Sequence, residues 1–384
     1  MERPRTLVFV GGGTGGHLQP GVVLRDALLR RHPDWRAPFL IAGRAVEKRF
    51  VPEGATCLEL FPGMSSRPAP WRADLYVRAW IAAARALARL KPDLLVFLGS
   101  YVAFLARLAR WNVPMVILES NVVPGRSVRL AAPFARRLFL QWLPPAEAKL
   151  PLERCSVTGM PLKFELLPQR EPARARLGLP RDGRVLLVLG GSLGATAVNE
   201  LLIAGASALA ATQGLTLLHL AGSRDCERVE AAYRSAGVEA VVLPFSDDMA
   251  SCYAAADLVV ARAGGMTVAE LAAAGRPALL IPYPHHRDHH QEWNARALAD
   301  AGAAWLVRES ETGGEFVRTH VLPKLADRDE LERRGRAAFE LGRRDATRRV
   351  VDEVERLLDL EIGVGVGIGE AAPAAQTRVA LSHG

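Results

Sequence analysis

The sequence predicts an α/β protein of two domains, each built around a largely parallel β-sheet. Short apolar runs alternate with segments of helical periodicity along most of the chain. These runs are continuous stretches of Val, Leu and Ile, which is typical of strands buried on both faces of a parallel sheet. A chain of 384 residues also exceeds what one hydrophobic core usually organises. A strand, a glycine-rich turn and a helix follow one another at residues 7–20 and again at 186–200, so the pattern restarts.

The elements follow in order along the chain. Strands are expected at residues 6–10, 38–42, 94–98 and 115–118 in the first domain, and at 185–189, 215–220, 240–243, 258–261 and 278–281 in the second. The proline-containing stretch 160–182 is the natural linker, so we place the domains at residues 1–163 and 164–345. A closing helix is expected at 346–361. The Gly/Ala/Pro-biased residues 362–384 are expected to form a disordered tail.

The charge of the chain favours anionic partners. The formal net charge is +8, carried mostly by arginine, which suits nucleotides, diphosphates or acidic lipid surfaces. Solvated helix faces are the alternative explanation. No basic run is interleaved with aromatic residues, so no nucleic acid partner is expected.

Cysteine usage and hydropathy indicate the compartment. The four cysteines are scattered without a Cys-x-x-Cys spacing, which predicts neither a zinc site nor a disulfide framework. The charged residues 1–5 lead directly into a strand, and no apolar stretch approaches 18 residues. We therefore expect a cytoplasmic protein whose membrane contact, if any, is peripheral.

The first glycine-rich turn covers residues 11–16 and satisfies the G-x-G-x-x-G fingerprint of dinucleotide-binding domains. The second strand, however, ends in Ala42-Gly43-Arg44 and lacks the acidic residue that would hold an adenosine ribose, so a nicotinamide or flavin enzyme is the weaker alternative. Glycines let backbone N–H groups approach a phosphate, and the following helix offers its positive end. His17 begins that helix and could accept a proton near neutral pH. A histidine bonded only to backbone is the alternative.

Two further glycine turns follow strands in the second domain. Residues 190–195 contain Ser192, which could donate to a phosphate oxygen or cap the next helix. Residues 262–270 offer backbone N–H groups and place Glu270 one helical turn in, where a carboxylate can accept both hydroxyls of a ribose. An acid favoured by the helix dipole is the alternative for Glu270. Equivalent phosphate cradles in two domains predict a cleft between them.

Several separated motifs resemble those of one family. They are residues 12–17 with Pro20, residues 190–199, Phe245 with residues 247–249, and residues 262–275. In this order they resemble the MurG family, bacterial enzymes that transfer N-acetylglucosamine from UDP to undecaprenyl-diphospho-N-acetylmuramoyl-pentapeptide in peptidoglycan synthesis. The similarity runs from about Leu7 to Val351.

The resemblance implies the GT-B fold, in which two Rossmann-like parallel-sheet domains face each other across a cleft. It implies an inverting transfer without metal or cofactor, with the lipid acceptor on the amino-terminal domain and the UDP-sugar on the carboxy-terminal one. His17 matches the proposed base, and Glu119 and Tyr101 match residues that line the cleft. The positions that match contacts to the UDP-sugar are Thr14, Gly15, Gly16, Asn121, Ser192, Ser246, Gly265, Met266, Thr267, Val268, Ala269, Glu270 and Gln291. Arg262 and Ser192 are expected to stabilise the leaving diphosphate.

The chain departs from the family pattern at several positions. Residues 118–121 read Leu-Glu-Ser-Asn where the family has His-Glu-Gln-Asn. Lys163 replaces the arginine of an Asn-Pro-Val-Arg motif, which exchanges a bidentate guanidinium for a point charge and leaves Lys163 as the expected substrate contact. Leu193 and Val128 replace a glutamine and an asparagine. A UDP-N-acetylglucosamine 2-epimerase and a non-catalytic UDP-sugar-binding protein of the same architecture therefore stay open as alternatives.

Two other stretches carry hypotheses. Residues 285–291 hold four histidines and an aspartate, which could bind a metal, but polar lining of the donor site is the preferred interpretation and no metal is expected. Residues 71–89 interleave apolar side chains with arginines, as in a surface helix that dips into an anionic leaflet. The expected membrane contacts are Trp71, Leu75, Trp80 and Ile81. A core-facing helix is the alternative, and the resemblance favours peripheral binding at the cytoplasmic face of the inner membrane.

Overall fold

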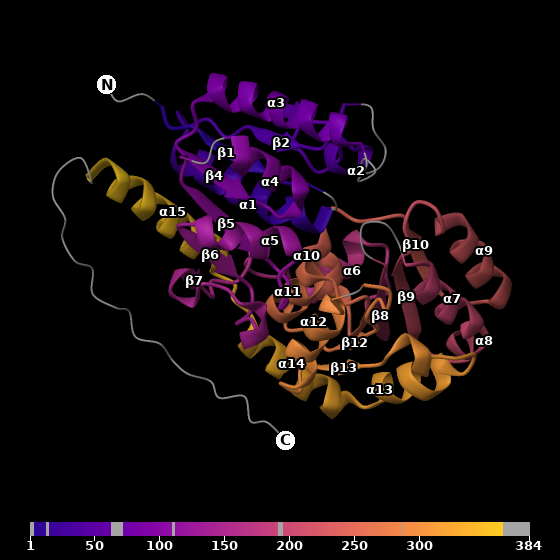
Figure 1. Ribbon diagram of the computed structural model, residues 1–384. Helices are drawn as coiled ribbons and strands as arrows, with labels where there is room; N and C mark the ends of the chain where they lie inside the picture. Colours follow the sequence, from indigo (N-terminus) through magenta and orange to yellow (C-terminus); the bar gives the residue numbers. More distant parts are fainter. Residues whose placement is uncertain are drawn as a thin grey trace.

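The computed structural model describes residues 4–12, 15–62, 72–109, 112–190, 195–286 and 288–363. It contains two parallel sheets, one in each half of the chain (Figure 1). The first sheet has seven strands in the order β3-β2-β1-β4-β5-β6-β7, and the second has six in the order β10-β9-β8-β11-β12-β13. Both orders reverse beside the first strand of the sheet, as in doubly wound nucleotide-binding folds. The predicted fold class is confirmed.

The strands of the first sheet are β1 (Leu7–Val10), β2 (Phe39–Ile41), β3 (Cys57–Glu59), β4 (Leu94–Phe97), β5 (Met115–Glu119), β6 (Arg137–Leu140) and β7 (Cys155–Ser156). Those of the second are β8 (Arg184–Leu189), β9 (Leu215–Leu220), β10 (Ala240–Leu243), β11 (Leu258–Ala261), β12 (Ala278–Leu280) and β13 (Ala304–Leu306). All of the predicted strands are confirmed. The sequence interpretation missed β3, β6, β7 and β13. Three of these are short edge strands, where apolar patterning is weakest because only one side is paired.

Helices cover both faces of each sheet. In the first domain they are α1 (Gly15–Arg31), α2 (Ala45–Lys48), α3 (Ala73–Leu90), α4 (Ser100–Ala109), α5 (Arg126–Ala131) and the short η1 (Ala132–Phe134), with η2 (Ala146–Ala148) and η3 (Leu152–Arg154) before β7. In the second they are α6 (Arg170–Arg176), α7 (Thr196–Ala204), α8 (Ala206–Ala210), α9 (Cys226–Ala236), α10 (Met249–Ala255), α11 (Gly265–Ala274), α12 (His290–Ala299), η4 (Glu309–Glu311), η5 (Val317–Val321), α13 (Leu322–Ala326) and α14 (Arg328–Leu341). The last helix is α15 (Ala346–Gly363).

The cores follow the two-residue period of the strands. Phe9 of β1 belongs to one buried cluster, whereas its neighbour Val8 belongs to another on the opposite face of the sheet. In the second sheet, Leu187 and Leu186 of β8 likewise belong to two different buried clusters. The cluster that contains Phe9 also contains Leu187, so one apolar layer continues from the first domain into the second. This shared layer fixes the two sheets relative to each other.

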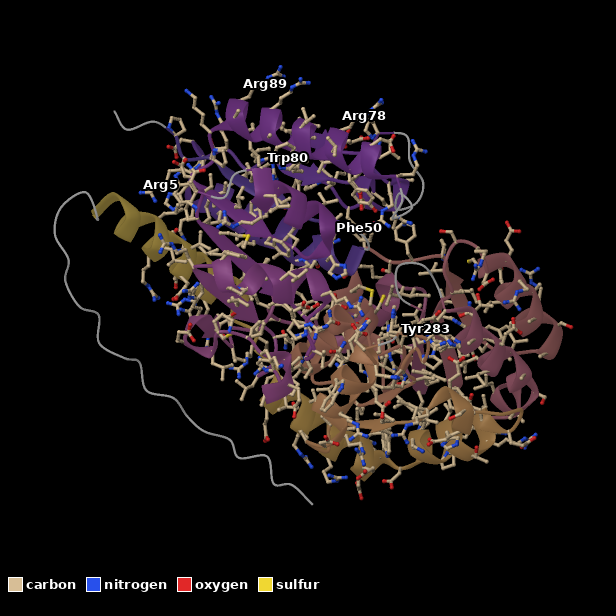
Figure 2. All side chains as sticks on the ribbon, viewed as in Figure 1. Arg5, Phe50, Arg78, Trp80, Arg89 and Tyr283 are labelled. Carbon is tan, nitrogen blue, oxygen red and sulfur yellow. The ribbon has the colours of Figure 1, made fainter. Side chains whose placement is uncertain are left out.

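Helix α3 lies on the outer face of the first domain (Figure 1). Ala79, Ala83 and Leu87 pack into the core at helical spacing. Arg78 and Arg89 point outward, and Trp80 also lies on the surface (Figure 2). Among the residues that the structure describes, no helix is long and apolar enough to cross a bilayer.

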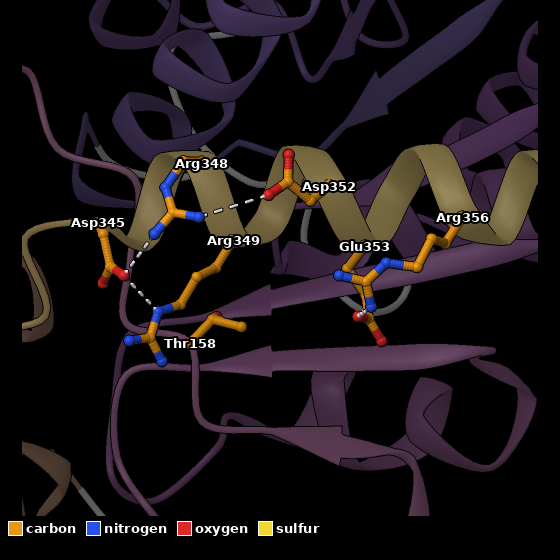
Figure 3. Close-up of a pocket in the computed structure, with 7 residues that line it drawn as sticks. All are labelled: Thr158, Asp345, Arg348, Arg349, Asp352, Glu353 and Arg356. Atoms are coloured by element: carbon orange, nitrogen blue, oxygen red, sulfur yellow. Dashed lines mark hydrogen bonds and ion pairs between the residues drawn. The ribbon is translucent and has the colours of Figure 1, made fainter. Parts of the chain in front are cut away.

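Helix α15 returns from the second domain to the first and packs along α1. Arg31 Nη1 lies 2.6 Å from Asp352 Oδ1 and 2.8 Å from Glu355 Oε2, and His32 Nε2 lies 2.7 Å from Glu355 Oε1. At the start of α15 is a polar pocket in which Asp345 pairs with two neighbouring arginines (Figure 3). The helix was expected at 346–361 as a separate unit, and its contacts join it to the first domain. The extents given for the domains stay a prediction.

We expect the protein to lose stability on mild acidification because of His219 in β9. This side chain is fully buried, with Nδ1 2.8 Å from Tyr233 Oη and Nε2 3.0 Å from Asn199 Oδ1. Burial lowers the pKa of His219 from 6.5 to about 3. Below pH 6.5 the unfolded chain therefore binds a proton at His219 that the folded chain does not bind. The contribution of His219 to the free energy of unfolding is complete above pH 6.5 and is lost as the pH falls toward 3.

Urea midpoints measured from pH 7.5 to pH 4 test this expectation. The wild-type midpoint should fall with pH, and His219→Gln, which cannot titrate, should show a shallower fall. The exposed His285→Gln is the matched control and should follow the wild type. Superimposable profiles for His219→Gln and the wild type would contradict the assignment.

Candidate active site

The first glycine turn follows β1, and its described residues Gly11 and Gly12 are packed too tightly for side chains. A Cβ atom on Gly11 would lie 2.6 Å from the Cβ atom of Leu98, and one on Gly12 would lie 2.5 Å from Glu47 Oε1. Gly15 and Gly16 open α1, so the helix begins two residues before His17, where the sequence placed its start. Thr14 lies outside the described residues. The turn thus brings bare backbone and a helix amino terminus to the carboxyl end of β1.

His17 lies in the first turn of α1, beside the loop that follows β4. A Cβ atom on Gly99 would lie 3.2 Å from His17 Cδ2, so the imidazole packs over the backbone of this glycine. Burial lowers the pKa of His17 to about 4, and the charges of His290 and Arg44 add to the effect. The ring is therefore neutral near pH 7, which a general base requires. Tyr101 lies two residues after Gly99, in α4, and its side chain is outside the described part.

Glu119 ends β5 and organises the loop that follows it. Its Oε1 accepts hydrogen bonds from the Asn121 backbone N–H at 2.9 Å and from Asn121 Nδ2 at 2.8 Å. Burial raises the pKa of the Glu119 carboxyl, and the bonds from Asn121 act in the opposite direction. These contacts indicate that Glu119 holds the backbone of the predicted donor contact Asn121. A direct catalytic role for Glu119 stays a prediction.

The third glycine turn meets this loop across the domain boundary. A Cβ atom on Gly265, the first residue of α11, would lie 2.5 Å from Ser120 Oγ and 2.9 Å from Asn121 Oδ1. Asn294 of α12 is fully buried and donates from Nδ2 to Asn121 Oδ1 at 3.0 Å and to the Ala263 carbonyl at 3.1 Å. Asn294 Oδ1 accepts from the Val122 N–H at 2.9 Å. Sequence reasoning missed Asn294, because nothing local distinguishes it from a surface asparagine.

Glu270 connects α11, the helix after the third glycine turn, to α1, the helix after the first. Its Oε1 accepts from Gln19 Nε2 of α1 at 3.1 Å, across 251 residues of sequence, and its Oε2 accepts from the buried Tyr253 hydroxyl at 2.8 Å. Burial raises the pKa of Glu270, opposed by the bonds from Tyr253 and Gln19 and by the charge of Lys163. The helix that carries the predicted base and the helix that carries the predicted ribose acid are therefore joined by a hydrogen bond between the domains. Residues 191–194, which include Ser192 and Leu193, lie outside the described residues.

Not every residue from 265 to 270 presents its side chain to this contact between the domains. Val268 and Ala269 are buried in the core, and the Val268 N–H donates a hydrogen bond to the Gly264 carbonyl at 3.0 Å. Thr267 is partly exposed, and Met266 is almost fully buried. The first residues of an α-helix have N–H groups without partners inside the helix, so a ligand at this end would meet backbone donors.

The guanidinium of Arg262 makes hydrogen bonds and an ion pair with other protein groups in this structure. Its Nη1 donates to the Ile281 and Pro282 carbonyls, both at 3.2 Å, and its Nη2 lies 2.5 Å from Glu309 Oε2. Arg262 thus holds the loop after β12, and its expected contact with the leaving diphosphate stays a prediction.

Three other predicted contacts have protein partners of their own. Lys163 Nζ lies 3.7 Å from Asp247 Oδ1, Ser246 Oγ accepts from the Asp248 N–H at 3.1 Å, and Gln291 Oε1 accepts from the Tyr283 N–H at 3.0 Å. Their expected roles toward a substrate stay predictions. The histidine-rich loop before α12 places its rings near one another, but no group of three or more metal-ligating side chains occurs in the described parts of the chain.

Comparison with known proteins identifies the class of enzyme to which the chain belongs. The model of the glycosyltransferase family 28 N-terminal domain matches residues 7–140, and that of the family's C-terminal domain matches residues 185–350. With two facing Rossmann-like domains, the chain is a glycosyltransferase of the GT-B fold.

Relatives named UDP-N-acetylglucosamine–N-acetylmuramyl-(pentapeptide) pyrophosphoryl-undecaprenol N-acetylglucosamine transferase occur in Acidothermus cellulolyticus, at 39% identity over 91% of this chain and 97% of the relative, and in Pelobacter propionicus, at 37% over 91% and 98%. The chain belongs to the MurG family. The crystal structure of Acinetobacter baumannii MurG is similar, with a TM-score of 0.71, 27% identity and coverage of 92% of this chain and all of that one. A UDP-N-acetylglucosamine 2-epimerase structure, at 16% identity, a TM-score of 0.65 and coverage of 98% and 100%, shares the fold alone.

Proposed function

We propose that the protein transfers N-acetylglucosamine from UDP-N-acetylglucosamine to undecaprenyl-diphospho-N-acetylmuramoyl-pentapeptide, a step of peptidoglycan synthesis and hence of cell-wall growth. The observation that carries this proposal is the contact between the domains at which α1, with His17 and Gln19, meets Glu270 of α11. The names of the relatives supply the donor and the acceptor.

The reaction follows from the groups on α1 and α11. The diphosphate of the donor would lie against the first-turn N–H groups of α11, and the ribose hydroxyls would bond to Glu270. His17, neutral near pH 7, would take the proton of the acceptor hydroxyl as that oxygen attacks the anomeric carbon from the face opposite UDP. A single displacement inverts the configuration. The backbone donors and the positive end of α11 would stabilise the charge that develops on UDP, so the step needs no metal.

A product assay tests the proposal. Purified protein is incubated with a panel of UDP-sugars and a short-chain lipid-linked muramoyl acceptor, and the products are identified by mass. We expect transfer from UDP-N-acetylglucosamine and from no other donor. Formation of UDP-N-acetylmannosamine without acceptor would indicate an epimerase, and binding of the donor without turnover would indicate a non-catalytic protein.

We further propose that α3 holds the protein at an anionic membrane, the cytoplasmic face of the inner membrane. Val77 is 53% exposed and Trp80 is 42% exposed, and Arg78, Arg85 and Arg89 are exposed on the same helix. Exposed apolar side chains next to cations suit an interfacial helix. Leu75 and Ile81 are only half-buried, so they could contribute part of their surface, and Trp71 lies outside the described residues.

Vesicle binding tests the role of α3. The double substitution Val77→Glu/Trp80→Glu should weaken co-sedimentation with phosphatidylglycerol vesicles by about tenfold or more, since it replaces apolar anchors by charges that an anionic surface repels. Phe339→Glu on α14, which removes another exposed aromatic side chain, is the control and should bind as the wild type does. Unchanged sedimentation of the double variant would rule α3 out as the anchor.

A further inference from the structure

Arg49 and Phe245 form a contact between the domains that takes no part in the proposed reaction. The guanidinium carbon of Arg49, Cζ, lies 3.3 Å from the centroid of the Phe245 ring, which is the geometry of a cation–π contact. Arg49 directly follows α2 in the first domain, and Phe245 lies two residues after β10 in the second. The contact therefore joins two segments that are far apart in the sequence and belong to different sheets.

On the side of the first domain, Arg49 is held by a short helix that packs against the first glycine turn. Glu47 of α2 is fully buried, and its Oε2 accepts from the Gly43 N–H at 2.9 Å and from the Arg44 N–H at 3.1 Å. A Cβ atom on Gly12 would lie 2.5 Å from Glu47 Oε1, so the carboxylate fills the space beside the turn. The backbone of Arg49 is thus fixed relative to that glycine turn.

On the side of the second domain, Phe245 is held by the loop between β10 and α10. Asp248 caps α10, because its Oδ1 accepts from the Ser251 N–H at 3.0 Å, and its Oδ2 lies 3.0 Å from Arg176 Nη1. Phe245 itself is 45% exposed, so the core of the second domain does not hold its ring. The loop is anchored, and the ring is free to meet a group of the first domain.

The contact lies near the edges of both sheets. Helix α2 follows β2, the neighbour of an edge strand in the first sheet, and β10 is an edge strand of the second, and both lie on one side of the molecule (Figure 1). The bond between Gln19 and Glu270 instead joins α1 to α11, which follow the inner strands β1 and β11. The contact of Arg49 with Phe245 is therefore separate from the predicted donor position and lies to one side of it.

We propose that Arg49 and Phe245 form a latch between the domains that opens to let the UDP-sugar enter and UDP leave. This inference rests on the proposed function, because it takes the donor to bind between α1 and α11. A cation–π contact between exposed side chains is weak, so it can break and reform in every turnover. The closed latch holds the domains together around the donor. Since the same contact closes before and after the donor binds, it slows entry and exit alike and leaves the affinity unchanged.

The rates of donor binding test the latch. Arg49→Ala should raise kon and koff about two- to fivefold each and leave Kd unchanged, as expected for the loss of one exposed cation–π contact. Arg344→Ala is the matched control, because Arg344 Cζ lies 3.5 Å from the centroid of Phe339 within the second domain, and it should keep both wild-type rates. Stopped-flow mixing with a fluorescent analogue of UDP-N-acetylglucosamine measures kon and koff. Wild-type rates in Arg49→Ala would overturn the proposal, and so would a faster koff with a weaker Kd, which would make Arg49 a direct donor contact.

A double-mutant cycle tests whether Arg49 acts through Phe245. Phe245→Leu keeps an apolar side chain but has no aromatic ring for the guanidinium. In this background Arg49→Ala should therefore change neither rate further. The same two- to fivefold increase in both backgrounds would contradict the latch, whatever other role Phe245 has, because each comparison is made within one background.

A measurement without donor separates this inference from the proposed function. Small-angle X-ray scattering should give a larger radius of gyration for ligand-free Arg49→Ala than for the wild type and Arg344→Ala, because its domains separate more often. Transfer by the wild type together with equal radii would refute the latch alone. A larger radius for Arg49→Ala without transfer by the wild type would refute the proposed function alone. Melting temperatures equal to that of the wild type show that the variants are folded.

Discussion

Replacing His17 by Ala is expected to lower kcat about 100-fold or more while donor affinity changes little. The imidazole packs over Gly99 and is neutral because burial and two nearby cations lower its pKa to about 4. It can therefore accept the acceptor's proton throughout the neutral range. The loss of kcat/KM on the acid side should follow this value and occur near pH 4 rather than near 6.5.

Donor binding and a matched variant show whether His17 is chemical or structural. His17→Gln keeps a polar side chain of similar size but no base, so it should be as slow as His17→Ala. Gln213→Ala, at an exposed residue before β9, should retain full activity. If His17→Ala instead loses binding of UDP-N-acetylglucosamine, the residue supports the turn and another group is the base.

Replacing Glu270 by Gln is expected to raise the KM for the donor about 30-fold or more, with a smaller effect on kcat. A buried carboxylate can accept both ribose hydroxyls, whereas an amide offers one acceptor oxygen and leaves a donor without a partner. Discrimination between UDP-N-acetylglucosamine and its 2′-deoxyribose analogue should shrink by about tenfold as well. Initial-rate kinetics with both donors measure these effects.

Gln19 provides the control for Glu270. In this structure Gln19 occupies one carboxylate oxygen that the ribose would need, so the donor must displace this interdomain bond. Gln19→Ala removes the competitor and keeps the carboxylate, so donor affinity should stay the same or rise. Donor KM values that are equal in Glu270→Gln and the wild type would contradict the assignment of the ribose site.

The parallel sheets could be predicted because each central strand is a continuous apolar run. Three of the four strands that escaped prediction are short: β7 covers two residues, and β3 and β13 cover three each. In such strands long-range pairing, rather than local sequence, decides the conformation. The return of α15 to the first domain also could not be predicted, since its acidic residues find Arg31 and His32 only in the folded molecule.

The candidate site, like the fold, could be predicted from the sequence only in part. His17 and Glu270 could be identified because glycine turns after parallel strands meet at one edge of a sheet. The contacts of Glu270 with Gln19, of Asn294 with Asn121, and of Arg262 with Glu309 depend on how distant segments are oriented. No pattern within one segment carries that information. The hydrogen bonds of Arg262 to the loop after β12 are one example, and its expected contact with the diphosphate stays a prediction.

A crystal structure of the protein with UDP-N-acetylglucosamine tests the central claim most directly. It should show the diphosphate at the amino terminus of α11, both ribose hydroxyls within hydrogen-bond distance of Glu270, and Gln19 displaced from the carboxylate. Nucleotide bound away from α1 and α11, with the bond between Gln19 and Glu270 intact, would contradict it.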